Sequence, residues 1–433
     1  MAIVSIVFSI IIAVLFLKIT KNIYNAATIF CGYWGILVFL NYLSLDGMHK
    51  PSELTYSYIF LGIFGFTIGC ILALLRTKRI NVKVRKGEPN YFLLKIACVI
   101  IIAYCLYRIS LIVVFLAQGY SWGEIRLMHG IAGDSGEGTL KGGTFSQILH
   151  DWCVAPLLYL LAPTLVIDLF IGKREKQFSI MAIVAMILYS VSTVSRAIWS
   201  FLILYAICVM IICKGKYQLP KKVKKWIRRI PIFIVILFLI IVFITQQRSA
   251  DSEANIILNM YAYLAGGISL MDIYLQSPIS NMCTYGFFSM YGFVQPIFFV
   301  LNYLHILDYP QAILDTIQIK DALEVYIPIS DHITMNAYST LFYNFYLDFR
   351  IVGIFIGSMI FGLICMKMYR NFKQRQDFKS LAIYLILVQF IIFSMARIYT
   401  SLTTRALTFI WILFMFRNSL DGGLNISGEK RGE

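Results

Sequence analysis

Long apolar runs, separated by shorter polar segments, dominate the pattern along the chain. Each run is close to the roughly 20 residues that a helix needs to cross a bilayer, so each predicts a transmembrane helix. Eleven such helices are expected, at about residues 2–17, 26–43, 56–75, 92–117, 154–171, 178–193, 197–213, 230–246, 351–368, 380–395 and 406–417. The pattern predicts an all-α polytopic membrane protein, with a single integral membrane domain over residues 1–433.

Two connecting segments are too long to be simple links between helices. The first covers about residues 118–153, and the second, much larger, covers about 247–350. The second contains two semi-apolar stretches, 259–275 and 287–307, which fit amphipathic helices on the membrane surface, a re-entrant pair or two further spans. The last alternative raises the number of spans from eleven to thirteen and leaves the remaining topology unchanged.

The composition agrees with a membrane protein. Hydrophobic residues make up 59% of the chain and charged residues 14%, and the mean hydropathy is +0.77. A soluble domain cannot bury that much apolar surface. The N-terminal run MAIVSIVFSIIIAVLFLK lacks a basic leading segment and a small-residue cleavage site, so we expect a retained span and not a signal peptide.

Basic residues are concentrated in alternate connecting segments, among them 76–86, 173–176, 214–229 and 370–379. Placing these segments in the cytoplasm, as the positive-inside rule requires, puts the N-terminus outside and the C-terminus inside. Of the 38 Lys and Arg residues, 28 are then cytoplasmic. The net charge of +16 therefore indicates topology and contact with anionic membrane lipids, and we expect no nucleic-acid partner.

The sequence lacks the common patterns of metal and nucleotide sites. Its nine cysteines are scattered without a C-x-x-C pair, and its five histidines show no H-E-x-x-H spacing. The segment GDSGEGTLKGG (133–143) lacks the G-K-[ST] ending of a phosphate-binding loop, and the cytoplasmic segments lack D-x-D. We expect no metal, no cofactor and no nucleotide-sugar donor.

Arginine is over-represented among the cations expected on the outer side. Seven of these ten cations are Arg, at positions 108, 126, 196, 248, 350, 397 and 405. A guanidinium offers a planar fork of donors that binds phosphates and carboxylates bidentately, so the set indicates an anionic substrate such as a pyrophosphate. The alternative is that individual arginines pair with outer acids or reach lipid headgroups.

Five of these arginines are expected to line one outer cavity. Arg196 begins a helix after a short turn, where the helix N-terminus also favours phosphate. Arg397 and Arg405 flank another short outer turn, and Arg126 lies in the first long outer segment. Arg248 directly follows a span at the membrane surface, so we assign it a catalytic role in neutralising a leaving group.

His332 is the outer histidine that fits a catalytic base best. Asp331 precedes it, and a polar run and a helix start follow it; near neutral pH an imidazole can accept a proton from a sugar hydroxyl. A hydrogen-bonded loop histidine is the alternative. His129 and His150 are weaker candidates, because their glycine-rich surroundings read as a flexible loop.

The polar run after His332 supplies further candidates for substrate binding. They are Asn336, Tyr338 and Asp348, which could contact sugar or pyrophosphate. For the tyrosine the alternative is an interfacial aromatic belt.

Three segments carry a resemblance to a known family. The stretch NAYSTLFYNFYLDFRIVGIFIGSMIFGLI (336–364) resembles the part of Wzy-type oligosaccharide repeat-unit polymerases in which an Asn/Thr/Tyr-rich segment leads into Asp-Phe-Gly and a glycine-rich span. GYSWGEIRL (119–127) and STVSRAIWSFLIL (192–204) look like that family's first outer segment and its short turn with an arginine. One departure is that Arg350 stands where the family has glycine after Asp-Phe.

The resemblance implies a GT-C-like polymerase or ligase architecture in a bacterial inner membrane. Such an enzyme transfers a growing glycan from undecaprenyl pyrophosphate to a new lipid-linked repeat unit on the outer side, without metal or cofactor. Its partners would be lipid-linked oligosaccharides, membrane lipids and a chain-length regulator protein. The alternatives are an O-antigen ligase, a membrane O-acyltransferase, or a flippase or exporter of lipid-linked oligosaccharides.

Overall fold

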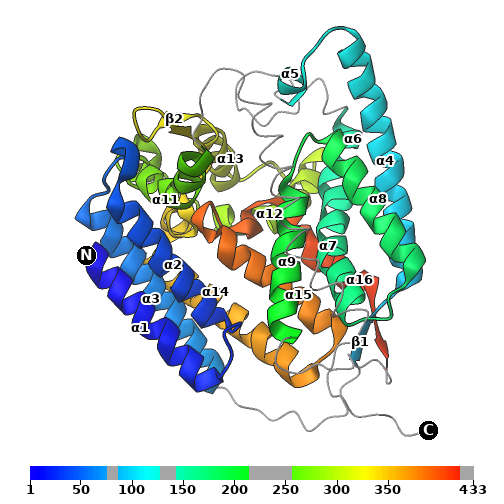
Figure 1. Ribbon diagram of the computed structural model, residues 1–433. Helices are drawn as coiled ribbons and strands as arrows, with labels where there is room; N and C mark the ends of the chain where they lie inside the picture. Colours follow the sequence, from blue (N-terminus) through cyan, green and yellow to red (C-terminus); the bar gives the residue numbers. More distant parts are fainter. Residues whose placement is uncertain (76–85, 127–142, 214–255, 420–433) are drawn as a thin grey trace, which may run out of the picture.

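A computed structural model describes residues 1–75, 86–126, 143–213 and 256–419 (Figure 1). Within these ranges the chain is almost entirely helical, as the apolar pattern predicts. The principal helices are α1 (Ala2–Thr20), α2 (Ala26–Leu43), α3 (Glu53–Leu75), α4 (Tyr91–Ala117), α7 (Ala155–Phe170), α8 (Lys176–Ser192), α9 (Ala197–Cys213), α11 (Ile256–Leu275), α12 (Phe287–Tyr303), α13 (Gln311–Leu323), α14 (Thr340–Arg375), α15 (Phe378–Ile392) and α16 (Thr403–Met415).

Ten of the eleven expected spans coincide with helices, and the expected span at 230–246 lies outside the described residues. In the described part of the chain, seven helical segments are long and apolar enough to cross a membrane: Ala2–Thr20, Ala26–Leu43, Glu53–Leu75, Tyr91–Ala117, Thr144–Phe170, Thr340–Arg375 and Phe378–Met395. The α8, α9 and α16 helices are apolar but shorter. The all-α class is therefore confirmed, and the protein has the helices of a polytopic membrane protein.

Polar residues begin several of these helices at the point where the apolar run starts. The side chain of Asn25 accepts a hydrogen bond from Thr28 N at 2.8 Å at the start of α2. Asp377 accepts one from Ser380 N at 2.7 Å at the start of α15. Such N-caps satisfy amide groups that have no partner inside the helix.

Helices α1, α2 and α3 pack together with α14 (Figure 1). Glycines make the contact between α3 and α14 close: a Cβ at Gly65 would meet the Phe355 carbonyl 2.6 Å away, and Gly69 and Gly362 also lie against backbone of the opposite helix. Small residues allow this approach between membrane helices, where packing and not the hydrophobic effect drives association.

A second group of helices consists of α4, α7, α8, α9, α15 and α16, to the right in Figure 1. The α7 helix contacts all the others and is buried up to Asp168 except at Tyr159. Buried apolar side chains from Ala2 to Phe416 form one continuous core that joins both groups.

The described parts of the basic segments expected in the cytoplasm lie at one end of the molecule. Strand β1 (Lys86–Pro89) pairs with β4 (Phe416–Ser419), and Glu88 of β1 lies 3.7 Å from Lys173 Nζ. At the same end, the side chain of Asp377 accepts a hydrogen bond from Gly87 N. These described segments therefore share one end, as the charge pattern predicts, and the assignment of that end to the cytoplasmic side of a membrane stays a prediction.

The described part of the large segment, residues 256–350, is folded toward the opposite end (Figure 1). Its two semi-apolar stretches form α11 and α12, followed by α13 and a small hairpin of β2 (Ile327–Pro328) and β3 (Thr334–Met335). The α11 helix packs against the C-terminal end of α2, where Asn41 Nδ2 donates to Ala265 O (3.1 Å) and Ser269 Oγ (2.9 Å).

The first long segment, 118–153, is less loop-like than its glycines suggest. It contains α5 (Trp122–Arg126) and α6 (Thr144–Leu149), and α6 continues through a π-helical turn, η3 (His150–Val154), into α7. The helical segment thus begins ten residues before the expected span at 154–171. Its start is polar, which hid it from a search for apolar runs. The expectation that His150 lies in a flexible loop is wrong.

Candidate active-site cavity

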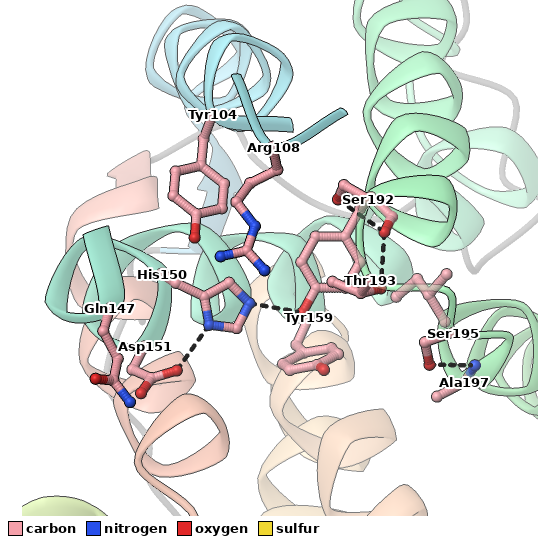
Figure 2. A pocket seen from close by; sticks show the side chains of 12 residues that line it. Tyr104, Arg108, Gln147, His150, Asp151, Tyr159, Ser192, Thr193, Ser195 and Ala197 are labelled. Atoms are coloured by element: carbon pink, nitrogen blue, oxygen red, sulfur yellow. Dashed lines mark hydrogen bonds and ion pairs between the residues drawn. The ribbon is translucent and has the colours of Figure 1, made fainter. Parts of the chain in front are cut away.

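A cavity of about 330 Å³ lies where α4, α7, α8 and α9 come together at the predicted outer end (Figure 2). Most of its lining is polar or aromatic, although the surrounding helices are apolar. The lining residues are Tyr104, Arg108, Gln147, His150, Asp151, Tyr159, Tyr189, Ser192, Thr193, Ser195, Ala197 and Ile198. Its volume is at the small end of the range for ligand sites.

An imidazole–carboxylate pair lies on the wall of this cavity. His150 Nδ1 is 2.7 Å from Asp151 Oδ1, and His150 Nε2 is 3.1 Å from the hydroxyl of Tyr189. An ionised carboxylate accepts hydrogen bonds but does not donate them. Beside an ionised Asp151, Nδ1 of His150 therefore donates, and Nε2 is the acceptor nitrogen that faces the Tyr189 hydroxyl. His150 and Asp151 both belong to the π-helical turn η3, and single π-turns occur frequently at functional sites.

Arg108 brings a positive charge to the same cavity. It lies on α4, is 6% exposed and lines the cavity beside Tyr104. Figure 2 shows its guanidinium pointing toward the imidazole of His150. A charged side chain buried in a membrane helix is costly, and such residues usually serve function.

A strained turn forms the hydroxyl-rich rim. Ser192, Thr193 and Ser195 line the cavity, and Val194 between them has a φ of 49°. A positive φ is an outlier for a β-branched residue, and backbone strain of this kind gathers at functional sites. The turn also presents Arg196 directly before the cavity residue Ala197.

Arg405 lies directly behind the cavity wall. It is 7% exposed, and its Cζ lies 3.2 Å from the ring centre of Tyr159, with Phe201 and Tyr399 at 4.6 and 5.3 Å. Tyr159 lines the cavity. The ring of Tyr159 therefore belongs to the cavity lining and also stacks on the Arg405 guanidinium.

Arg397 uses one of its guanidinium nitrogens for hydrogen bonds within the fold. Its Nη2 donates to Glu324 Oε1 at 3.1 Å and to the carbonyl of Ala337 at 3.0 Å. Burial raises the pKa of Tyr338 to about 12, while the charges of Arg397 and Arg196 oppose the rise. Burial likewise raises the pKa of Tyr399, and Arg405 and Arg397 oppose it. Arg397 therefore acts on both tyrosines, together with Arg196 on Tyr338 and with Arg405 on Tyr399.

Other predicted site residues lie away from the cavity or form hydrogen bonds that stabilise the fold. His332 is exposed at the tip of the β2–β3 hairpin, on the opposite side of Figure 1 from α6 and α7. The side chain of Asn336 donates to Glu324 O at 2.7 Å. Asp348 accepts hydrogen bonds from Thr284 Oγ1 and from the amides of residues 286, 288 and 289, which caps α12. Arg248 and the Arg126 side chain lie outside the described residues.

The sequence does not predict several of the cavity residues. It marks Arg108 only as one of the outer arginines, without a role, and no motif distinguishes Tyr159 and Tyr189. The adjacent pair His150-Asp151 just before an apolar run was a usable signal. In the described part of the chain, no group of three or more His, Cys, Asp or Glu residues is arranged to hold a metal ion.

Comparison of the chain with protein-family models, with curated proteins and with solved structures found no match.

Proposed function

We propose that the protein polymerises oligosaccharide repeat units linked to undecaprenyl pyrophosphate, on the outer side of a bacterial inner membrane. The product would be a surface polysaccharide such as O-antigen, capsule or exopolysaccharide. The observation that carries the proposal is the cavity in which His150, Asp151 and the buried Arg108 meet at one end of an apolar helical bundle. A base and a cation in one polar cavity match the two needs of glycosyl transfer from a pyrophosphate.

The chemistry divides between these side chains. The acceptor hydroxyl attacks the anomeric carbon of the donor, a new C–O bond forms, and the C–O bond to pyrophosphate breaks. The hydroxyl proton passes to Nε2 of His150, and Asp151 at 2.7 Å stabilises the resulting imidazolium. Undecaprenyl pyrophosphate leaves as an anion, and preorganised guanidinium groups stabilise the charge that develops on it.

The wider group of arginines supports an anionic donor. Arg196 and Arg397 act electrostatically on one tyrosine, Tyr338, and Arg405 stacks on the cavity residue Tyr159. The helices around this group are apolar, as a site for lipid-anchored substrates requires. The GT-C-like architecture and the inner-membrane location belong to this proposal.

A membrane O-acyltransferase is the second candidate, because His150 lies at the start of a helical segment that is buried in the bundle. An acyltransferase uses a histidine near a buried span to deprotonate a sugar hydroxyl. It would take an acyl donor from the cytoplasm and would not release undecaprenyl pyrophosphate.

Reconstitution separates these functions. Purified protein in liposomes is given undecaprenyl-pyrophosphate-linked repeat units, and the products are resolved by length. Ladders of lipid-linked oligomers with stoichiometric release of undecaprenyl pyrophosphate are expected. Transfer that requires lipid A-core would indicate a ligase, and acyl transfer from a labelled thioester without chain growth would indicate the acyltransferase. Either result would overturn the proposal.

A further inference from the structure

We propose that Tyr159 is a gate between the cavity and Arg405, and that an anionic ligand of the pyrophosphate class moves this ring aside to bind the guanidinium. The inference rests on the proposed function for its choice of ligand. Its structural basis is one aromatic ring, Tyr159, that lines the cavity and also stacks on a buried cation.

The first observation is an unsatisfied buried charge. Arg405 is 7% exposed, and within the described residues its Nη1 has no hydrogen-bond partner. A buried polar group without a partner is costly, and a charged one more so. The N–H groups at Nη1 of Arg405 are therefore available to a ligand that reaches them.

The second observation is that aromatic rings surround the guanidinium. Tyr159 of α7 lies closest, Phe201 of α9 is next, and Tyr399 contributes from the turn before α16. Of these three rings, Tyr159 alone belongs to the cavity lining. Movement of Tyr159 is thus the shortest route by which Arg405 gains access to the cavity.

The energetic balance favours opening by an anion. A cation–π contact is weaker than a bidentate, charge-assisted hydrogen bond from a guanidinium to phosphate oxygens. A pyrophosphate that reaches Arg405 therefore replaces a weak contact with a strong one. An uncharged sugar offers no such gain and leaves the ring in place.

Equilibrium binding without turnover tests the gate. Inorganic pyrophosphate and, separately, undecaprenyl pyrophosphate are titrated into detergent-solubilised protein. Tyr159→Ala removes the ring and should tighten binding of at least one of them by roughly 10-fold, the equivalent of one charge-assisted hydrogen bond. Tyr159→Phe keeps the ring and should bind less tightly than Tyr159→Ala. Tyr303→Ala, at an exposed tyrosine of α12, is the matched control.

The double variant Tyr159→Ala/Arg405→Gln identifies the group that is uncovered. It should lose the whole gain made by Tyr159→Ala. A gain for undecaprenyl pyrophosphate alone would assign the anion to a lipid, and a gain for both would assign it to the pyrophosphate group itself. Tyr159→Leu replaces Tyr159→Ala if the latter does not fold. Unchanged or weaker binding by the gate variant, or a gain that survives loss of Arg405, would overturn the gate whether or not the protein polymerises glycans.

Discussion

Nδ1 of His150 lies 2.7 Å from Oδ1 of Asp151, although the two residues are consecutive in the chain. Neighbouring residues on a regular α-helix do not face each other, whereas these two sit on the π-helical turn η3. The pairing orients the imidazole so that Nε2 faces the cavity and the hydroxyl of Tyr189.

This pairing makes His150 the base that geometry favours, whereas the sequence favours His332. His150→Ala should lower the transfer rate by ~10²–10⁴-fold, the usual contribution of a general base. The matched variant His332→Ala changes an exposed hairpin residue and should retain most activity. Rates at equal protein levels in liposomes decide between them. The opposite ranking would return the catalytic role to His332.

Asp348 should stabilise the fold by capping α12. Its carboxylate accepts hydrogen bonds from Thr284 Oγ1 at 2.7 Å and from three backbone amides. Asp348→Ala leaves these donors unpaired and should lower the free energy of unfolding by about 3 kcal/mol. Asp348→Asn keeps one acceptor and should lose less. Chemical unfolding in detergent measures both, and an alanine variant as stable as wild type would argue against the cap.

Arg350 occupies a backbone conformation that suits glycine. Its φ of 57° and ψ of −140° interrupt α14 at the point where the resembling family has glycine. Arg350→Gly and Arg350→Ala both remove the contacts of the guanidinium with the carbonyls of Ser280 and Asn281. They differ in strain, so the glycine variant should be more stable by about 1–2 kcal/mol. Equal melting temperatures would show that the bend relaxes.

Lys320 should make stability depend on pH. Burial, with Arg397 nearby, lowers its pKa from 10.5 to about 7, despite Glu324, Asp321 and Asp151. The amine also donates to Ser401 O at 3.2 Å and lies 3.8 Å from the ring centre of Tyr291.

Because the pKa of Lys320 is lower in the folded protein, burying the charged amine destabilises the fold. This destabilisation has its full size below about pH 7. The penalty disappears as the pH rises toward 10.5. Lys320→Met should therefore raise the melting temperature more at pH 6 than at pH 10, and Lys50→Met, at an exposed lysine, controls for loss of charge. An equal effect at both pH values would show that the amine is solvated in solution.

The sequence predicts most of the helices but not the arrangement of side chains in the candidate site. Apolar length marks a span such as α3 directly, whereas the polar start of the helical segment at Thr144 resembled a loop. A glycine-rich neighbourhood also disguised His150. The sequence predicts Arg196, Arg397 and Arg405 as outer arginines, and this stays a prediction. Their proximity depends on helix packing across some 200 residues of sequence. The placement of Tyr159 over Arg405 depends on the same packing.

The most direct test of the cavity as the catalytic site is the rate of chain growth in liposomes for two arginine variants. Arg108→Gln removes a 6%-exposed cation from the cavity wall, and Arg417→Gln removes an exposed cation from the opposite end of the bundle. With lipid-linked repeat units as substrate, we predict that Arg108→Gln slows chain growth by ~10²–10³-fold, as loss of one electrostatic donor does, while Arg417→Gln extends chains normally. Equal chain growth by both variants at matched protein levels would contradict the assignment of this cavity as the active site.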